Sequence, residues 1–284
     1  MLALPIGAIT YVCIRRWPHR DPLAPHLAPT TVVEKVRRHP RARALVRSRL
    51  DSTTETGLLL TVAVGVLVVS VTGFGVILEM VRSNRGLASY DRFFADWGAH
   101  HATASSTRGL KLISLLGGYP AVIVLSCAVA AAEYRRKLSR SVVPLLVLVV
   151  GGQFAVADLV KFTVNRARPS VSQLTGFSGT SFPSGHAAAA SATFAVFALI
   201  LGRRRSPAVK ALLGAAATTI AAAVASTRVL LGVHWFTDVV AGLFIGWAWF
   251  TVLSIAFGGR VMRFGAPVEQ AQAVAKPKLV TNQP

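Results

Sequence analysis

Three short clusters of cationic, hydroxyl and imidazole side chains stand out along the second half of the chain. The first holds Lys161 and, seven residues later, Arg168 followed by Pro169. A lysine supplies a compact positive charge and an arginine supplies a planar pair of N–H donors, and both fit phosphate oxygens. Because Pro169 cannot continue a helix, it is expected to turn the chain there. This cluster predicts an anion site next to a helix end.

The second cluster, Ser181-Phe182-Pro183-Ser184-Gly185-His186, stands at the start of an apolar run. The first N–H groups of a helix are free and lie at the positive end of its dipole, which makes a helix start a ready anion site. Ser184 can cap this helix or donate to a phosphate oxygen, and Gly185 lets the backbone approach the ligand closely. His186 is therefore expected beside the bound anion.

The third cluster contains Arg228, His234 and Asp238. His234 and Asp238 are four residues apart, so they share one face if a helix begins near them. A carboxylate that accepts from one imidazole nitrogen fixes the tautomer and leaves the other nitrogen free to attack. Arg228 precedes the turn and can reach the same phosphate. These residues alone do not decide whether His186 or His234 attacks, although the pairing with Asp238 favours His234.

Each of these residues also has an ordinary structural explanation when it is taken alone. An aspartate at a helix start interacts with the helix dipole, an arginine at the end of a span extends to the interface, and a single interfacial histidine is commonly structural. Their combination at one membrane face favours a phosphate site. Asp158 lies three residues before Lys161 on the same helix face. Because a buried acid in an apolar helix needs a partner, Asp158 is expected to have a supporting role.

Six apolar runs are expected to position the clusters. Of the 284 residues, 53% are hydrophobic and only 15% are charged, which excludes a disordered chain and is unusual for a soluble domain. A bilayer core of about 30 Å requires about 20 mostly apolar residues in each spanning helix. The runs that meet this requirement are 57–79, 110–132, 141–160, 184–202, 208–230 and 235–257. The expected fold class is all-α, an integral membrane bundle of six transmembrane helices over residues 57–257.

The formal net charge of +20 would suggest a nucleic-acid partner, but the positions of the charges argue against one. Of the 31 Lys and Arg residues, 22 fall before the first run, in the loops after the second and fourth runs, and in the tail. By the positive-inside rule, both termini are cytoplasmic and the three clusters face the extracytoplasmic side of the cell membrane. Residues 1–56 are expected to be a basic cytoplasmic segment with a short apolar start suited to the interface. Residues 258–284 are expected to be a disordered cytoplasmic tail.

The loop after the first run contains a further pattern. Tyr90, Phe93, Phe94 and Trp97 recur at helical spacing, so they are predicted to share one face of a short helix. Aromatic rings of this kind lie at headgroup depth in the membrane interface. Asp91 falls off this face. The helix is interpreted either as a screen at a lipid entrance or as a simple membrane anchor.

Together the three clusters resemble the signature of the type 2 phosphatidic acid phosphatase superfamily. Its pattern is Lys, six residues, Arg-Pro; then Pro-Ser-Gly-His; then Ser-Arg, five residues, His, three residues and Asp. Thr227 stands where the family has Ser, and it retains the hydroxyl group. The resemblance covers the six apolar runs and implies a metal-independent phosphatase that needs no cofactor.

The resemblance also implies a role for each matching residue. His234 is similar to the nucleophile that forms a phosphohistidine, Asp238 to the residue that orients it, and His186 to the general acid for the leaving oxygen. The residues similar to the family's phosphate cradle are Lys161, Arg168, Ser184, Gly185 and Arg228.

The favoured function is a membrane lipid phosphatase that hydrolyses a polyprenyl diphosphate of the cell-wall carrier cycle, such as undecaprenyl or decaprenyl diphosphate. Phosphatidic acid and phosphatidylglycerophosphate are alternative substrates. Transfer of the phosphoryl group to an acceptor other than water is an alternative reaction. Membrane lipids are expected as further partners, and nucleic acid is not. A channel or transporter is disfavoured because few charges lie within the apolar runs.

Overall fold

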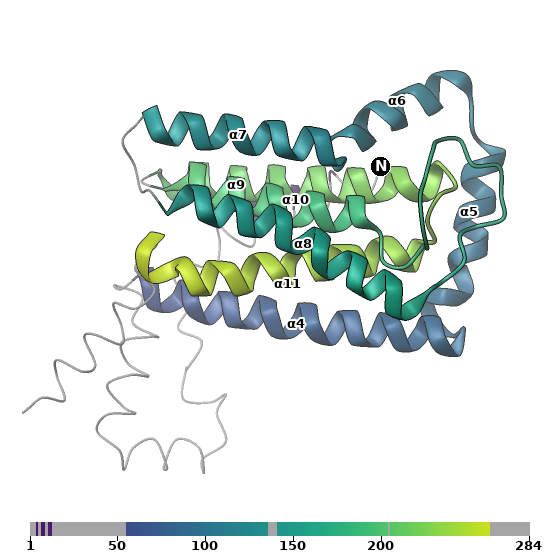
Figure 1. Ribbon diagram of the computed structural model, residues 1–284, viewed down its shortest axis with the longest axis horizontal. Helices are drawn as coiled ribbons and strands as arrows, with labels where there is room; N and C mark the ends of the chain where they lie inside the picture. Colours follow the sequence, from purple (N-terminus) through teal and green to yellow (C-terminus); the bar gives the residue numbers. More distant parts are fainter. Residues whose placement is uncertain are drawn as a thin grey trace, which may run out of the picture.

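The computed structural model describes residues 55–135, 141–203 and 205–261, together with positions 4, 7, 8, 11 and 12. Within these residues the regular elements are helices and no strand occurs (Figure 1). The predicted basic N-terminal segment and the predicted C-terminal tail lie almost wholly outside the described residues. The all-helical fold expected from the apolar runs is confirmed.

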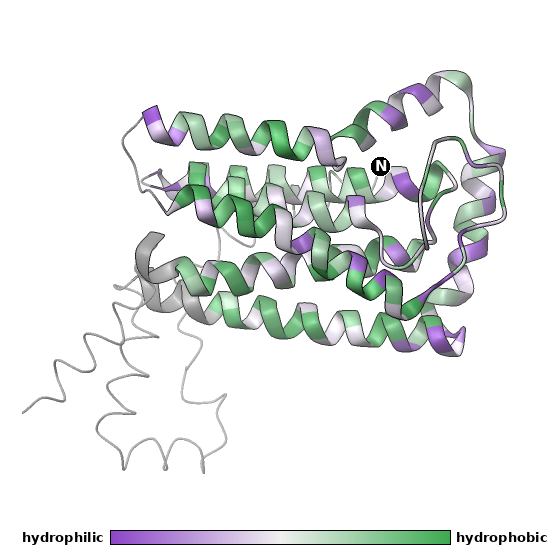
Figure 2. Ribbon diagram, viewed as in Figure 1, coloured by the Kyte–Doolittle hydropathy of each residue, from purple (hydrophilic) through white to green (hydrophobic). Residues whose placement is uncertain are grey.

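Five long helices form most of the bundle. Each contains a stretch that is long and apolar enough to cross a membrane. Figure 2 shows hydrophobic residues along the length of these helices and hydrophilic residues gathered toward their ends, as a bilayer requires. The helices are α4 (Glu55–Ser83), α8 (Val142–Val164), α9 (Gly185–Gly202), α10 (Pro207–Leu230) and α11 (Phe236–Val261). They correspond to five of the six predicted spans.

The remaining predicted span, 110–132, is a broken span and not one continuous helix. It consists of α6 (Ala104–Leu115) and α7 (Tyr119–Arg135), whose axes are bent by 47° at a short break. With this pair taken as one broken span, the bundle has six membrane-crossing units.

Close packing at two glycines explains the break between α6 and α7. A Cβ atom on Gly117 would lie 2.5 Å from a methyl carbon of Val224 and 2.7 Å from the carbonyl oxygen of His186. Only glycine permits such an approach, so the backbone here runs directly against α9 and α10. The adjacent Gly118 completes the turn, and a Cβ on it would lie 3.7 Å from His186 Nε2.

Helix α9 lies in the middle of the bundle, in contact with α7, α8, α10 and α11. Its first turns are rich in alanine, and Ala187 to Ala190 are all fully buried. On the facing side of α11, a Cβ on Gly242 would lie 2.5 Å from the carbonyl oxygen of Ser184. Small residues let membrane helices approach closely. This contact sets the position of the start of α9 against the start of α11.

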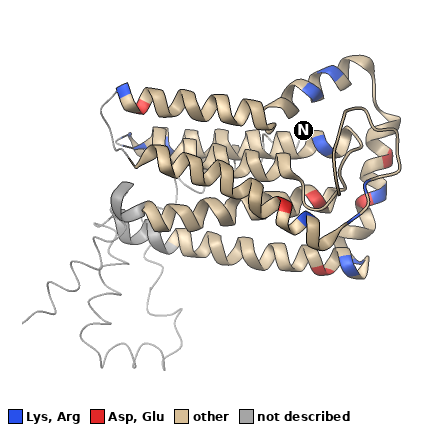
Figure 3. Ribbon diagram, viewed as in Figure 1, with Lys and Arg blue, Asp and Glu red and all other residues tan. Residues whose placement is uncertain are grey.

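Two short helices close one end of the bundle. They are the 3₁₀ helix η1 (Gly86–Tyr90) and α5 (Asp91–His100), which lies across that end (Figure 1). Figure 3 shows that charged residues concentrate at this end and are sparse along the middle of the long helices. The predicted short helix is therefore confirmed, with Tyr90 in the preceding 3₁₀ turn.

The aromatic face of α5 is divided between the bundle and the surface. Phe94 points inward and stacks on Phe236, with 4.8 Å between the ring centroids. Tyr90, Phe93 and Trp97 remain exposed. This exposure suits rings that lie in the interface of a bilayer.

Candidate active site

The structure brings the three sequence clusters together at the end of the bundle that α5 covers. The first cluster follows α8, the second begins α9, and the third joins α10 to α11. The Ser184 N–H donates to the Asp238 carbonyl at 2.9 Å, and Arg168 Nη1 lies 3.3 Å from His234 Nε2. His186 follows Gly185 in the first turn of α9, and the side chain of Lys161 lies against this turn.

His234 occupies the turn between α10 and α11 and is buried, with 3% of its side chain exposed. Its Nδ1 lies 3.5 Å from Asp238 Oδ2. Its Nε2 faces Arg168, and a guanidinium can only donate hydrogen bonds. Nε2 therefore carries the lone pair, and the proton of the neutral ring lies on Nδ1, toward Asp238. This tautomer leaves the lone pair of Nε2 available for nucleophilic attack.

Burial also keeps the His234 ring neutral. Removal from water lowers the pKa of His234, and this effect outweighs the nearby Asp238, which acts to raise it. The positive charges of Arg168 and Arg228 act in the same direction as burial. A neutral imidazole is the form that can attack phosphorus.

Asp238 is completely buried in the first turn of α11. Its Oδ2 accepts from the Trp235 N–H at 2.9 Å and from the Ser181 hydroxyl. Its Oδ1 accepts from Arg166 Nη1 at 2.7 Å. The carboxylate is thus held on both oxygens, which fixes its position beside His234.

Arg168 is held mainly by backbone carbonyls. Its Nε and Nη2 donate to the carbonyl oxygens of Gly179, Ser178 and Thr180 at 2.7–3.1 Å. Its Nη1 donates to the Val233 carbonyl at 2.5 Å and faces His234. The sequence predicted that this arginine binds phosphate oxygens through its planar pair of N–H donors. In the structure most of its donors bind backbone carbonyls of the loop after α8, and Nη1 also reaches His234 Nε2.

Arg228 has a different environment. It is 5% exposed in the last turn of α10, and its Nη1 donates to the Ser114 hydroxyl of α6 at 2.9 Å. Its Nε has no hydrogen-bond partner, and no carboxylate of the described chain pairs with it. A buried cation without a counter-charge is costly to the fold. This one is therefore a strong candidate for holding an anionic ligand.

Lys161 lies at the edge of the site, against the start of α9. A Cβ on Gly185 would lie 3.5 Å from its Nζ, which places the ammonium beside the free N–H groups of that helix. Ser184 caps α9, with its hydroxyl accepting from the Ala187 N–H. The helix start and the lysine thus present positive charge to the same space.

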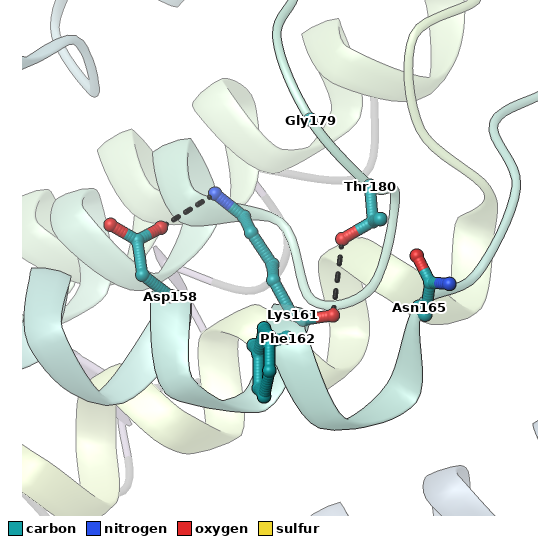
Figure 4. Close-up of a pocket in the computed structure, with 6 residues that line it drawn as sticks. All are labelled: Asp158, Lys161, Phe162, Asn165, Gly179 and Thr180. Carbon is teal, nitrogen blue, oxygen red and sulfur yellow. Dashed lines mark hydrogen bonds and ion pairs between the residues drawn. The ribbon is translucent and has the colours of Figure 1, made fainter.

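A cleft of about 330 Å³ adjoins Lys161. Figure 4 shows the lysine side chain crossing it toward Asp158, with which it forms an ion pair at 3.0 Å. Asp158 was predicted as a buried partner. The pairing with Lys161 is found, but 59% of the Asp158 side chain is exposed because it faces this open cleft. The cleft is lined by Asp158, Lys161, Phe162, Asn165, Gly179 and Thr180.

Four further residues surround Asp238 or its direct partners, and no role was predicted for them from the sequence. They are Asp91, Arg166, Ser181 and Thr237. Arg166 stands inside the first cluster, two residues before Arg168, and this position was the available signal. Nothing in the sequence indicated that Asp91, 75 residues away, would pair with it.

Comparison with known proteins agrees with this arrangement. Residues 141–261 match the family model described as the PAP2 superfamily. This part of the chain is similar to the PAP2 superfamily. The matched region runs from α8 to α11 and contains all three clusters, and the resemblance expected from the sequence is confirmed.

The relatives are bacterial lipid phosphatases. The lipid A 1-phosphatase of Rhizobium etli is 38% identical over 109 residues, which cover 35% of this chain and 43% of that protein. The phosphatidylglycerophosphatase B of Bacillus subtilis is 33% identical over 122 residues, which cover 42% and 60%. The chain thus matches less than two thirds of the length of these curated relatives.

A solved structure extends the likeness beyond the matched region. It is the transmembrane PAP2-type phosphatidylglycerolphosphate phosphatase from Bacillus subtilis, which is 26% identical to this chain. The TM-score is 0.63, and the alignment covers 70% of this chain and 98% of the solved one. The similarity therefore includes helices outside residues 141–261.

Proposed function

We propose that this protein is a membrane lipid phosphatase that acts through a phosphohistidine and uses no metal ion. The observation that carries this proposal is the buried, uncompensated charge of Arg228 beside His234 and the start of α9. A phosphate dianion would supply the missing counter-charge. Because Lys161, Arg168 and Arg228 already supply positive charge, the site favours an anion and disfavours a metal cation.

In this proposal the reaction has two steps, which are carried out by His234, His186 and Asp238. Nε2 of His234 attacks phosphorus, the bond from phosphorus to the leaving oxygen breaks, and His186 gives that oxygen a proton. Asp238 stabilises the positive charge that develops on the His234 ring. In the second step, a water molecule gives its proton to His186 and attacks phosphorus, which releases inorganic phosphate and regenerates His234.

A polyprenyl diphosphate is the first candidate substrate. The Lys161 ammonium lies at the rim of the site and borders the 330 Å³ cleft, which leaves space for a second phosphoryl group next to the one that is transferred. If Lys161 contacts this second group, Lys161→Ala will raise KM for a diphosphate by a larger factor than KM for a phosphomonoester. Equal factors would point to a phosphomonoester as the substrate.

Phosphatidylglycerophosphate is the second candidate. It is supported by the named activity of the Bacillus subtilis phosphatidylglycerophosphatase B and by the similar structure from the same organism. The exposed Asp158 carboxylate beside Lys161 offers an acceptor for the hydroxyl group of a glycerol-containing substrate.

The orientation proposed for the protein places this site on the extracytoplasmic side. The site lies at the opposite end of the bundle from Arg135 and Arg203, which belong to the two basic loops (Figures 1 and 3). Basic loops remain in the cytoplasm. Both termini are therefore placed in the cytoplasm.

The test is phosphate release by the purified protein from micelles that contain one lipid at a time, with EDTA present throughout. The panel contains a polyprenyl diphosphate, phosphatidylglycerophosphate and phosphatidic acid, and His234→Ala is the control. Release from at least one lipid by the parent protein alone supports the proposal. Absence of release from every lipid, or activity that returns only with Mg²⁺, would overturn it.

A further inference from the structure

Arg166 bridges two buried carboxylates that come from different helices. Its Nη2 donates to Asp91 Oδ2 of α5 at 2.7 Å, and its Nη1 donates to Asp238 Oδ1 of α11 at 2.7 Å. The side chains of Asp91 and Asp238 are 4% and 0% exposed, and that of Arg166 is 18% exposed. Charge-assisted contacts of this length in a buried site are strong and geometrically restrictive.

Asp91 also fixes the start of α11. Its Oδ1 accepts from the Thr237 N–H at 2.8 Å, and its Oδ2 accepts from the Thr237 hydroxyl at 2.6 Å. The first N–H groups of a helix lack acceptors within the helix, so Asp91 caps α11 from outside. The residue that follows Thr237 is Asp238, whose carboxylate faces His234. The cap thus acts directly on the turn that carries the partner of the nucleophile.

The surroundings of Arg166 leave little freedom for movement. Its Nη1 also donates to the Thr237 hydroxyl at 2.8 Å, and its guanidinium carbon lies 5.4 Å from the centre of the Trp235 ring. The Arg166 carbonyl accepts from the Ser181 N–H at 2.8 Å, and the Ser181 hydroxyl donates to Asp238. The Arg166 guanidinium thus contacts Asp238, which lies near Nδ1 of His234, whereas Arg168 lies near Nε2.

We propose that Asp91 and Arg166 are positioning residues for His234, and that they act through Asp238. The inference rests on the proposed function, because it assigns His234 as the nucleophile. Arg166 holds Asp238 Oδ1, which directs Oδ2 toward the Nδ1 proton of His234. Asp91 offsets the charge of Arg166 and anchors the turn. Helix α5, which exposes Phe93 and Trp97, is thereby connected to His234 through Arg166 and Asp238.

A double-substitution cycle distinguishes positioning from a merely structural contact. Arg166→Gln is expected to lower kcat by about 10- to 100-fold with KM nearly unchanged, the range typical of outer contacts that orient a reactive group. In an Asp238→Asn background the same substitution is expected to lower kcat by less than about threefold, because the group through which it acts is already altered. Arg92→Gln, which changes an exposed neighbour on α5, is the matched control. Equal factors in both backgrounds, or a rise in KM with kcat unchanged, would overturn the proposal.

A second measurement does not depend on turnover. Nitrogen-15 spectra of histidine-labelled protein report the ring tautomer, and His234→Gln identifies the His234 signals by their loss. The parent protein and Arg92→Gln should show the Nδ1–H tautomer, and Arg166→Gln should show a mixture. An unchanged tautomer in Arg166→Gln would contradict positioning even if no lipid of the panel were hydrolysed.

A milder variant covers the case in which Arg166→Gln does not fold. Asp91→Asn keeps the size of the side chain and can still accept from Thr237, but it removes the charge that faces Arg166. It is expected to lower kcat by about tenfold and to produce the same tautomer mixture. Asp96→Asn on the same helix is its control. An inactive parent protein would refute the proposed function, whereas an active parent with an unaffected Asp91→Asn variant would refute only the positioning role.

Discussion

Arg168 Nη1 lies 3.3 Å from His234 Nε2, and the same guanidinium is tied to four backbone carbonyls. One side chain therefore connects the loop at residues 178–180 to the nitrogen that would attack phosphorus. An incoming phosphate oxygen has to share this guanidinium with His234. In the proposed mechanism, this contact would hold the phosphate group in front of the attacking nitrogen.

Arg168→Lys is expected to behave as a severe change. A lysine has no planar fork, so it cannot keep contacts to Ser178, Gly179 and Val233 at once. We expect kcat/KM to fall by about 10²- to 10³-fold, the effect of removing one preorganised donor from a charged transition state. We also expect a lower Tm. Steady-state kinetics and a thermal melt of the same preparation check both expectations, and a fully active variant would contradict the account of this residue.

Arg228→Met should separate stability from activity. The variant removes a buried charge that has no counter-ion, so its Tm should rise by a few degrees, corresponding to about 1–3 kcal/mol. Phosphatase activity should be lost, because the phosphate group would no longer have the buried positive charge of Arg228 as a partner. A rise in Tm together with a loss of activity is typical of residues that are retained for function at a cost in stability.

Ligand stabilisation gives the matching control for Arg228. Vanadate or inorganic phosphate at 100 times its Kd should stabilise the parent protein by about 2.7 kcal/mol and should leave the Arg228→Met variant almost unchanged. A melt in which both proteins gain equally would show that the anion binds elsewhere.

The sequence predicted the bundle well because each span carries its own signal. The runs that became α4, α8, α9, α10 and α11 are long and apolar, and bilayer thickness alone imposes that length. The break between α6 and α7 was missed because Gly117 and Gly118 resemble ordinary glycines of a membrane helix. Their contact with His186 and Val224 appears only once α9 and α10 are in place.

For the candidate site, the clustered residues could be predicted from the sequence, but the long-range contacts between them could not. Lys161, His186, Arg228 and His234 lie in short clusters whose spacing is informative. Asp91 was placed off the aromatic face of its helix, but its contact with Arg166 joins residues 75 positions apart. No local pattern encodes such a contact. The Arg168 guanidinium contacts both backbone carbonyls and His234, and these contacts likewise form only once the loop is folded.

The pH dependence of kcat/KM should reflect the neutral His234. The ordinary pKa of histidine is about 6.5, and burial lowers that of His234. Because the neutral ring attacks, activity is retained as pH falls through 6.5 and is lost only at the lower pKa. A pH profile from 4.5 to 8 measures this acid limb, and loss of activity centred above pH 6.5 would contradict the burial effect.

Asp238→Asn provides the corresponding control for the pH profile. Asp238 acts to raise the pKa of His234, so its removal should move the acid limb to still lower pH. The plateau value of kcat should fall at the same time, because the developing imidazolium loses its partner. An acid limb that moves upward would exclude Asp238 as the group that acts on His234.

His186→Ala should depend on the leaving group. A general acid contributes about 10²- to 10⁴-fold for an alkoxide leaving group and much less for one that leaves unprotonated. We therefore expect the variant to retain far more activity on p-nitrophenyl phosphate than on a lipid phosphomonoester. The two rates measured on one preparation decide the matter, and equal losses on both substrates would remove His186 from this role.

The most direct test of the account is rapid-quench labelling, stopped either in acid or in base, with a substrate that carries labelled phosphate, in EDTA, on the parent protein, His186→Ala and His234→Ala. A phosphohistidine is labile in acid and stable in base, so short quench times in both conditions identify it. The account predicts a base-stable label on the parent protein and on His186→Ala, and none on His234→Ala. A label that persists in His234→Ala and disappears in His186→Ala would contradict it, because His186 would then be the nucleophile.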